Sequence, residues 1–353
     1  MKEMKDPRDP ALPDSSDELY ERFSFTVDRG QEPLRIDKFL MNRIEGATRN
    51  KLQQAINAGL VLVHGKEVRP NYKVRPLDEI LVYSDMNPEE TDVLPEPIPL
   101  NIVHEDADLL VINKPAGLVV HPGSGNYTGT LLNGVAWYLQ QQHPGLTEAN
   151  LPRFGLVHRI DKNTSGLLVL AKTDRAMRLL AKQFYDHTVR RQYIALVWGE
   201  LQDDSGTIRA HVGRNLRHRK LFEAYPEGDH GKEAITHYRV LERFGYVTLV
   251  ACELETGRTH QIRVHMKYLG HPLFNDDFYG GDRIVKGTVY ARYKQFVENC
   301  FALCPRQALH ARTLGFVHPT TGQEIFFESP LPADMEAVIT KWREYARNRG
   351  AAR

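Results

Sequence analysis

The sequence has few cysteines and no long apolar run. Its three cysteines, Cys252, Cys300 and Cys304, are too few for a disulfide framework, and no second pair of ligands stands at zinc spacing, so we expect buried thiols. No stretch approaches the roughly 18 apolar residues of a membrane span, and no apolar segment follows the first residues as it does in a signal peptide. We therefore expect no membrane association and a cytoplasmic protein.

The chain also lacks an excess of charge of either sign. It holds 46 Lys and Arg and 45 Asp and Glu among 353 residues, a net charge of +1. Attraction of a polyanion by the whole surface is therefore excluded, and any nucleic-acid binding must come from local basic patches. No cofactor motif is present, so we expect no cofactor. The length suits one large catalytic domain and one small module.

Composition divides the first hundred residues into three parts. Residues 1–22 are polar and contain three prolines, which predicts a mobile tail. Residues 23–85 combine alternating apolar segments with two amphipathic helices, the second capped by Thr48 and ended by Gly59, and they predict a compact domain. Residues 86–100 carry four acids and four prolines, which predicts an extended, self-repelling linker.

The small domain is locally basic. From Arg35 to Arg75, nine Lys and Arg stand against three acids. A solvated helical face is the plain interpretation, and contact with phosphate groups is the functional one. The cations that the functional interpretation selects are Arg35, Lys38, Arg49, Lys51 and Lys66.

Residues 154–172, FGLVHRIDKNTSGLLVLAK, are the stretch around which the rest of the chain is organised. Their pattern predicts a buried strand, a polar turn that carries Asp161, and a second buried strand. A carboxylate within an apolar segment is costly to bury unless hydroxyls, N–H groups and a cation hold it ionised, and an ionised carboxylate in a cleft suits a nucleophile. An aspartate that only caps a turn is the alternative.

Three segments resemble the signature motifs of the RluA/RluD-type RNA pseudouridine synthases. Residues 158–168, HRIDKNTSGLL, match the pattern HR[LI]DxxTSGLL. Residues 191–197, RQYIALV, match a strand motif built around a tyrosine, and residues 256–265, TGRTHQIRVH, match a third motif. Residues 113–122, NKPAGLVVHP, resemble a further segment, NKPxGxxxHP, of the same family.

The resemblance implies a catalytic centre of three residues. Asp161 stands at the position of the family's catalytic aspartate, Arg263 at that of the arginine that pairs with it, and Tyr193 at that of an active-site tyrosine. From the residues alone, a strand tyrosine is more often part of the core. A paired-carboxylate glycosidase fits poorly, because these motifs contain no second acid.

The resemblance also implies contacts to the substrate. Arg159 stands where the family has the wedge that fills the gap left by a flipped base, and the neighbouring His158 is a further substrate-binding candidate. Leu309 matches an apolar residue that contacts the target base. We expect no metal site, because none of the six histidines near the motifs forms a His-x-x-x-His pair with an acid.

Two further segments predict contact with RNA. Residues 35–40, 48–51 and 61–66 resemble the alpha-L RNA-binding domain, with Thr48 where a serine usually stands. Residues 206–223 hold five Lys and Arg and few apolar side chains, which predicts a flexible basic loop that contacts phosphates, with a solvated loop as the alternative.

We therefore expect an α+β protein. A pseudouridine synthase domain over residues 101–349, with a mixed, mainly antiparallel sheet flanked by helices and loops, would follow a small alpha-L domain. The implied activity is isomerisation of specific uridines, most of all in large-subunit ribosomal RNA or a pre-ribosomal particle, by a monomer. The alternatives are a synthase that acts on transfer RNA and a non-catalytic RNA-binding or ribosome-assembly factor on the same scaffold.

Overall fold

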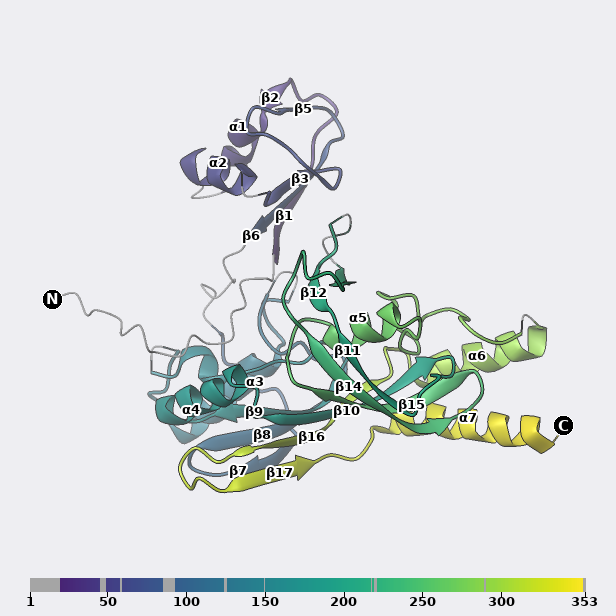
Figure 1. Ribbon diagram of the computed structural model, residues 1–353. Helices are drawn as coiled ribbons and strands as arrows, with labels where there is room; N and C mark the ends of the chain where they lie inside the picture. Colours follow the sequence, from purple (N-terminus) through teal and green to yellow (C-terminus); the bar gives the residue numbers. More distant parts are fainter. Residues whose placement is uncertain are drawn as a thin grey trace.

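The structure, a computed structural model, contains a small N-terminal unit and a large unit built on one extended sheet (Figure 1). The residues that it describes are 20–44, 49–57, 59–84, 93–123, 126–148, 150–216, 218, 221–288 and 290–351.

The small unit has a four-stranded sheet in the order β1-β6-β3-β4, a two-stranded ladder of β2 and β5, and two short helices. Strand β1 begins at Tyr20, so residues 20–22, which we assigned to the tail, belong to this sheet. Gly59 ends the second helix with a left-handed φ of 71°, whereas the predicted cap Thr48 lies outside the described residues. The elements are β1 (Tyr20–Thr26), β2 (Leu34–Arg35), α1 (Ile36–Met41), α2 (Arg49–Asn57), β3 (Val61–Val63), β4 (Lys66–Glu67), β5 (Lys73–Val74) and β6 (Glu79–Ser84).

The described half of the predicted linker is not free in solvent. Val93 is only 6% exposed. The Glu96 backbone N–H donates to the Asn133 carbonyl at 3.0 Å, and the Asn133 side chain donates to the Leu94 carbonyl at 2.7 Å. Prolines keep the segment extended, but backbone groups between them still find partners on a neighbouring helix. Residues 93–100 therefore pack on the large unit, and residues 85–92 lie outside the described part.

The large unit is organised by a nine-stranded sheet in the order β11-β14-β15-β10-β16-β9-β8-β7, with β17 paired to β16. Among its described ladders, β16 and β9 run parallel and the others are antiparallel, which confirms the expected mixed, mainly antiparallel α+β class. Its strands are β7 (Ile102–Glu105), β8 (Leu109–Lys114), β9 (Ser165–Ala171), β10 (Arg190–Trp198), β11 (Ser205–Arg209), β14 (Ile235–Arg243), β15 (Val247–Leu254), β16 (Leu309–Val317) and β17 (Glu324–Glu328).

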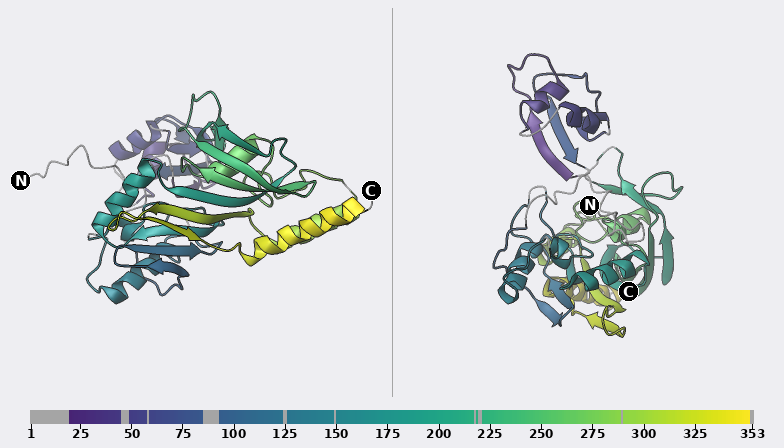
Figure 2. Two further views of the ribbon diagram at one scale, coloured as in Figure 1. Left: turned by 60° about the horizontal axis from the view of Figure 1, so that its bottom comes forward. Right: turned by 90° about the vertical axis from the view of Figure 1, so that its left-hand side faces the viewer.

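Helices cover both faces of this sheet, so its central strand is buried on both sides. Alternate residues of β10 point into different cores: Ala195 and Val197 join one hydrophobic cluster with α3 and α4, while Leu196 and Trp198 join another with α6 and α7. Helix α7, which ends near the C-terminus, lies along one side of the unit (yellow in Figure 2). No helix in the described part of the chain is both long and apolar enough to span a membrane. The helices are α3 (Leu131–Gln142), α4 (Asp174–Tyr185), α5 (Gln261–Tyr268), α6 (Ala291–Leu303) and α7 (Ala333–Ala351).

The prediction of two strands in residues 154–172 is half right. Residues 165–171 form β9, but residues 156–160 are an irregular segment, buried at Leu156, Val157 and Ile160, that follows a short 3-10 turn, η2 (Pro152–Gly155). Gly155 has a φ of 76°, and a Cβ atom there would lie 1.8 Å from the Ala171 carbonyl oxygen. The close approach of this turn to β9 leaves no room for a regular strand, although the apolar run is buried as expected.

Candidate active site

Asp161 lies in the tight turn immediately before β9. The Thr164 backbone N–H donates to the Asp161 carbonyl at 3.1 Å and closes the turn. Gly166 follows with a φ of 117°, and a Cβ atom there would lie 2.2 Å from the Ala311 carbonyl oxygen. Only glycine therefore permits the parallel contact of β9 with β16 at this point, and that contact brings Asp161 close to the first residues of β16.

A buried arginine that no motif indicated fixes this turn. Arg306 is 7% exposed, and its Nη1 donates to the carbonyls of Asn163 and Leu309, both at 3.0 Å. Its Nε donates to Asp334 at the start of α7 at 2.7 Å. One guanidinium thus joins the turn that carries Asp161, strand β16 and helix α7, which holds the turn rigidly.

Arg263, on α5, pairs with Asp161 as the resemblance implied. Its side chain is almost completely buried, and Nη1 donates to Asp161 Oδ2 at 3.1 Å. The other edge of the same guanidinium makes a two-point contact with Asp276, since Nε and Nη2 donate to its two carboxylate oxygens at 2.8 Å each. Arg263 is therefore held between two carboxylates and cannot swing away from Asp161 without breaking the contact with Asp276.

Asp276 is a site residue that the sequence analysis missed. It is fully buried and also accepts the backbone N–H groups of Phe278 and Tyr279 at 3.1 and 3.2 Å. It lies in a loop after α5, outside every recognised motif. The one available signal was a count of donors, because a buried guanidinium has five N–H groups and a single carboxylate satisfies at most two of them.

The electrostatics keep the Asp161 carboxylate ionised. Burial raises the pKa of Asp161, but the positive charges of His260, Arg263 and Arg159 outweigh burial and hold this pKa below its usual value. Burial also lowers the pKa of His260, so its imidazole carries a positive charge only in acid, whereas Arg263 and Arg159 remain cations near Asp161 at neutral pH. Asp161 is consequently an anion at neutral pH.

Asp161 opens into a cavity of about 640 Å³, a size suited to a small organic ligand. Tyr193 and Leu309, on the adjacent strands β10 and β16, line it and are 7% and 4% exposed. Burial raises the pKa of the Tyr193 phenol, the charge of Arg191 opposes this, and that of Asp161 adds to it, so the hydroxyl stays protonated. The structure thus brings Asp161, Arg263, Tyr193 and Leu309 to one cavity.

The two residues before Asp161 occupy different environments in the same cavity. Arg159 is exposed on its lining. His158 stacks on Phe184 with ring centroids 4.4 Å apart, and its Nε2 accepts the Val169 backbone N–H at 3.0 Å. Burial and the charge of Arg191 lower the pKa of His158 to about 3. His158 is therefore a neutral ring that braces the loop against β9, while Arg159 faces the open side.

The lining of the cavity is rich in basic side chains. Arg153, Lys232 and Arg258 line it, together with Arg191 of β10, whose buried Nε has no hydrogen-bond partner in the described part of the chain. The predicted flexible basic loop at residues 206–223 is mostly regular structure instead. It contains β11 and a hairpin of β12 (His211–Arg214) and β13 (Phe222–Tyr225), and residues 217, 219 and 220 lie outside the described part.

The basic residues predicted for the small unit differ in their surroundings. Arg35 and Arg49 both donate to Asp37, which is fully buried. Burial raises the pKa of Asp37, but hydrogen bonds from Arg35, Gln53 and Arg49 lower it well below the usual range. Part of each of these two guanidinium groups is thus committed to the fold, whereas Lys38 is exposed. Lys66 is also exposed, and the side chain of Lys51 lies outside the described residues.

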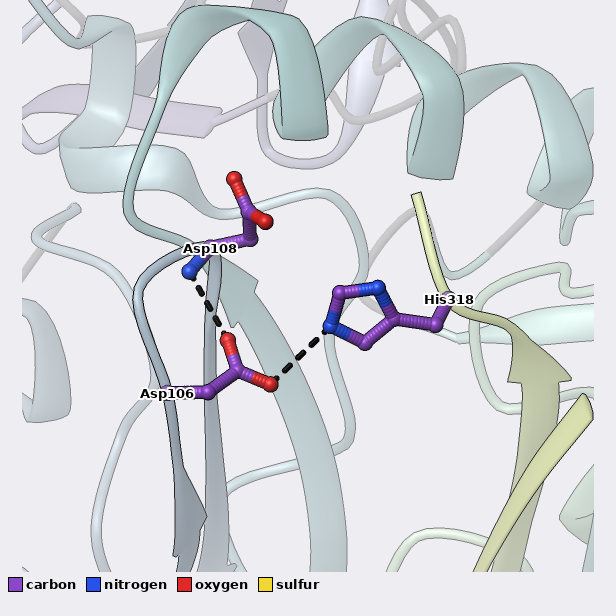
Figure 3. Close-up of side chains that lie close together, drawn as sticks. All are labelled: Asp106, Asp108 and His318. Atoms are coloured by element: carbon purple, nitrogen blue, oxygen red, sulfur yellow. Dashed lines mark hydrogen bonds and ion pairs between the residues drawn. The ribbon is translucent and has the colours of Figure 1, made fainter. Parts of the chain in front are cut away.

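A cluster of Asp106, Asp108 and His318 at the end of β16 is also close enough to suggest a metal site (Figure 3). His318 Nδ1 accepts the backbone N–H groups of Thr320 and Thr321, both at 3.1 Å, so the ring proton is on Nε2 and is donated to Asp106 at 3.0 Å. A nitrogen that carries a proton cannot bind a metal. The cluster therefore joins the end of β16 to the turn between β7 and β8.

Comparison with known proteins identifies related sequences over both units. The family model described as RNA pseudouridylate synthase matches residues 108–268, and the S4 domain model matches residues 34–80, within the segment predicted as an alpha-L domain. An uncharacterized RNA pseudouridine synthase of Chlorobaculum parvum is 46% identical over 90% of this chain and 96% of its own. The ribosomal large subunit pseudouridine synthase D of Nitrosomonas europaea is 43% identical over 93% of this chain and 91% of its own.

A solved structure shares the fold. Human RNA pseudouridylate synthase domain containing 4 superposes with a TM-score of 0.55 at 24% identity, over 69% of this chain and 93% of that chain. At this identity the likeness concerns the fold, while the close relatives establish the family over nearly the whole chain. With an intact aspartate motif and an S4 domain before it, the chain belongs to the RluA-type RNA pseudouridine synthases.

Proposed function

We propose that this synthase converts one or a few uridines of large-subunit ribosomal RNA to pseudouridine, with Asp161 as the catalytic carboxylate. The observation that carries the proposal is the ionised Asp161, which is paired with Arg263 and opens into a cavity lined by Tyr193 and Leu309. The choice of ribosomal RNA rests on the relatives named ribosomal large subunit pseudouridine synthase D, which match both the S4 and the catalytic segments. A transfer-RNA target is the second candidate.

The reaction is an isomerisation that needs no oxidant or energy source. The bond between ribose C1′ and uracil N1 breaks, the base turns, carbon 5 bonds to C1′ and loses its proton, and N1 takes up a proton. A carboxylate can assist by attack on the sugar, by attack on the base or by removal of a proton, and each of these routes requires the anion. Arg263 keeps Asp161 in that form, and the walls formed by Tyr193 and Leu309 retain the detached base.

The proposed role of Arg159 is to fill the stack after the target base leaves it. Flipping a base out of a structured RNA costs a few kcal/mol, and on a loose single strand the cost is smaller. Arg159→Ala should therefore slow single-turnover modification of a structured RNA fragment more than that of an unstructured oligonucleotide with the same target sequence. Parallel time courses on the two RNAs measure this difference. Equal losses on both would rule out the wedge.

The S4 unit is proposed to hold the RNA away from the cavity. Removal of residues 1–88 should leave a folded catalytic unit that modifies ribosomal RNA more slowly and binds it with a shallower salt dependence, because fewer phosphates are neutralised. The measurement is the slope of binding affinity against salt concentration, together with the modification rate at the same sites. An unchanged slope and rate in the truncated protein would contradict the role of this unit as the RNA anchor.

A subtler variant keeps the whole chain. Lys38 and Lys66 are exposed in the S4 unit, and Lys38→Gln/Lys66→Gln should reduce the salt slope by about 1.4 to 1.8 if both contact phosphates. Lys294→Gln/Lys341→Gln makes the same change of net charge on helices α6 and α7, and it should leave the slope unchanged. Equal salt slopes for the two double variants would mean that the RNA does not contact Lys38 and Lys66.

The proposed setting of this activity is the cytoplasm, with the protein acting as a monomer on ribosomal RNA or a pre-ribosomal particle. A non-catalytic assembly factor on this scaffold would not require an ionised aspartate beside a cavity. The two hypotheses differ in one observable, because only the enzyme releases the proton from carbon 5 of uridine. Tritium release from RNA labelled at that carbon therefore separates them.

A further inference from the structure

His260 lies in the cavity beside Asp161 and has an unusual backbone. It precedes α5 with φ 56° and ψ 19°, in the left-handed region, which is costly for a residue other than glycine and persists where the surroundings impose it. Its Nε2 atom is 3.8 Å from Asp161 Oδ1, too far for a hydrogen bond. The Phe222, Phe278 and Tyr279 rings pack around the imidazole in edge-to-face geometry. The backbone strain thus places an imidazole at the reacting carboxylate.

The hydrogen bonds of the neighbouring Tyr279 determine which nitrogen of His260 carries the proton. The Tyr279 hydroxyl oxygen accepts the Phe222 backbone N–H at 3.1 Å and lies 2.8 Å from His260 Nδ1. Within the described residues, Nδ1 is the one acceptor that this hydroxyl proton can reach, so Tyr279 donates to Nδ1. The imidazole, whose pKa burial lowers, then carries its own proton on Nε2, the atom 3.8 Å from Asp161 Oδ1, and the residue lines the cavity.

On the basis of the proposed function, we propose that His260 is a catalytic hydrogen-bond donor whose Nε2–H binds a carbonyl oxygen of the detached uracil. When the C1′–N1 bond breaks, the base takes the electron pair, and its negative charge spreads to the carbonyl oxygens. A fixed donor aimed at that charge stabilises the departing base. Because a neutral imidazole holds its N–H proton strongly, it donates a hydrogen bond without protonating the base, which stays an anion and can bond again through carbon 5.

This assignment makes Tyr279 a positioning residue and connects the site to the β12–β13 hairpin. Phe222 belongs to β13, and its backbone N–H donates to the Tyr279 oxygen, which holds the hydroxyl in place beside His260. The Phe222 backbone N–H thus donates to the Tyr279 hydroxyl, and this hydroxyl donates to His260 Nδ1. Loss of either hydrogen bond should lower the rate of the chemical step and leave the affinity for RNA unchanged.

A matched pair of amide variants tests the donor. In His260→Gln the side-chain NH₂ group can reach about as far as Nε2, whereas in His260→Asn it ends near the position of Nδ1, and asparagine tolerates the left-handed backbone well. We expect His260→Asn to lower the single-turnover rate by about 100-fold with unchanged RNA binding, as for removal of a single oxyanion donor. His260→Gln should retain a rate within about tenfold of wild type.

Tyr279→Phe tests the fixed tautomer. Without the hydroxyl, the imidazole proton can occupy either nitrogen, so the single-turnover rate should fall by several-fold, again without loss of RNA binding. Tyr225→Phe is the control, because the Tyr225 hydroxyl donates to the Arg214 carbonyl at 2.8 Å in the same hairpin and does not contact His260. Melting temperatures of all four variants verify that each is folded.

Two results would overturn the proposal that His260 is a hydrogen-bond donor. One is a rate for His260→Asn within twofold of wild type. The other is a rate for His260→Gln as low as that of His260→Asn, since proton transfer, which an amide cannot perform, would then be the role of the imidazole. Failure of the proposed function is distinguishable, because the wild-type protein itself would then form no pseudouridine in the ribosomal RNA substrate.

Discussion

Asp161→Asn is expected to abolish pseudouridine formation and to leave RNA binding nearly unchanged. The amide keeps the shape of the side chain but removes its charge and its ability to act as nucleophile or base. The variant should fold, because Arg263 retains its two-point contact with Asp276 and no buried cation is left unpaired. Tritium release from RNA labelled at carbon 5 of uridine measures turnover, and filter binding measures affinity.

The control for this variant is a second carboxylate that the catalytic role does not include. Asp174 pairs with Arg178 at the exposed start of α4, and neither residue lines the cavity, so Asp174→Asn removes the same charge away from it. Its turnover should match that of wild type. Measurable turnover by Asp161→Asn above the background without enzyme would refute the assignment of Asp161.

Arg263→Met should cause the second-largest loss of activity and a loss of stability as well. The substitution leaves Asp276 as an uncompensated carboxylate in a fully buried position, and breaking a buried pair in this way costs about 3–5 kcal/mol of unfolding free energy. It also removes a permanent cation from Asp161, so the pKa of this carboxyl should rise and less of the anion should be present. Denaturant unfolding and single-turnover rates measure the two effects.

The two effects of Arg263→Met can be separated. In the double variant Arg263→Met/Asp276→Asn the buried charge is gone, so much of the stability should return while the activity does not.

The effect of pH on the Asp161–Arg263 pair has a definite sign. The folded state lowers the pKa of Asp161, so the pair contributes stability above the ordinary carboxyl pKa and loses it as the pH falls through the lowered value. In Arg263→Met the acidic limb of the rate profile should move to higher pH. A rate near that of wild type at neutral pH would disprove the ion-pair hypothesis.

Asp161, Tyr193 and Arg263 could be predicted from the sequence because each lies in a contiguous motif, and Leu309 from its match to a single apolar position. Asp161, Tyr193, Arg263 and Leu309 meet at one cavity, as the resemblance implied. Asp276 could not be predicted, because its partner is thirteen positions away, around a loop whose path depends on the tertiary fold. Apolar residues alone were also ambiguous, since Leu156, Val157 and Ile160 are buried as in a strand, but their segment is irregular and follows a left-handed turn.

The polar contacts around the motifs could not be predicted from the sequence either, because they depend on the tertiary fold. Thr173 caps α4 by accepting the Ala176 backbone N–H, whereas Asp174, which also has the right chemistry for a cap, is the first helical residue. Arg306 joins two segments more than a hundred residues apart through backbone carbonyls, which carry no side-chain pattern. Sequence patterns thus identified residue types, and the contacts required the folded chain.

Mapping of pseudouridines in ribosomal RNA from cells that lack this protein tests the central claim most directly. The cells should be complemented in parallel with the wild-type chain, with Asp161→Asn or with an empty vector. The account predicts that one or a few uridines of the large-subunit RNA are unmodified in the deletion strain, regain pseudouridine with the wild-type chain, and remain uridine with Asp161→Asn. An unchanged set of ribosomal pseudouridines in the deletion strain, or restoration of the missing ones by Asp161→Asn, would contradict it.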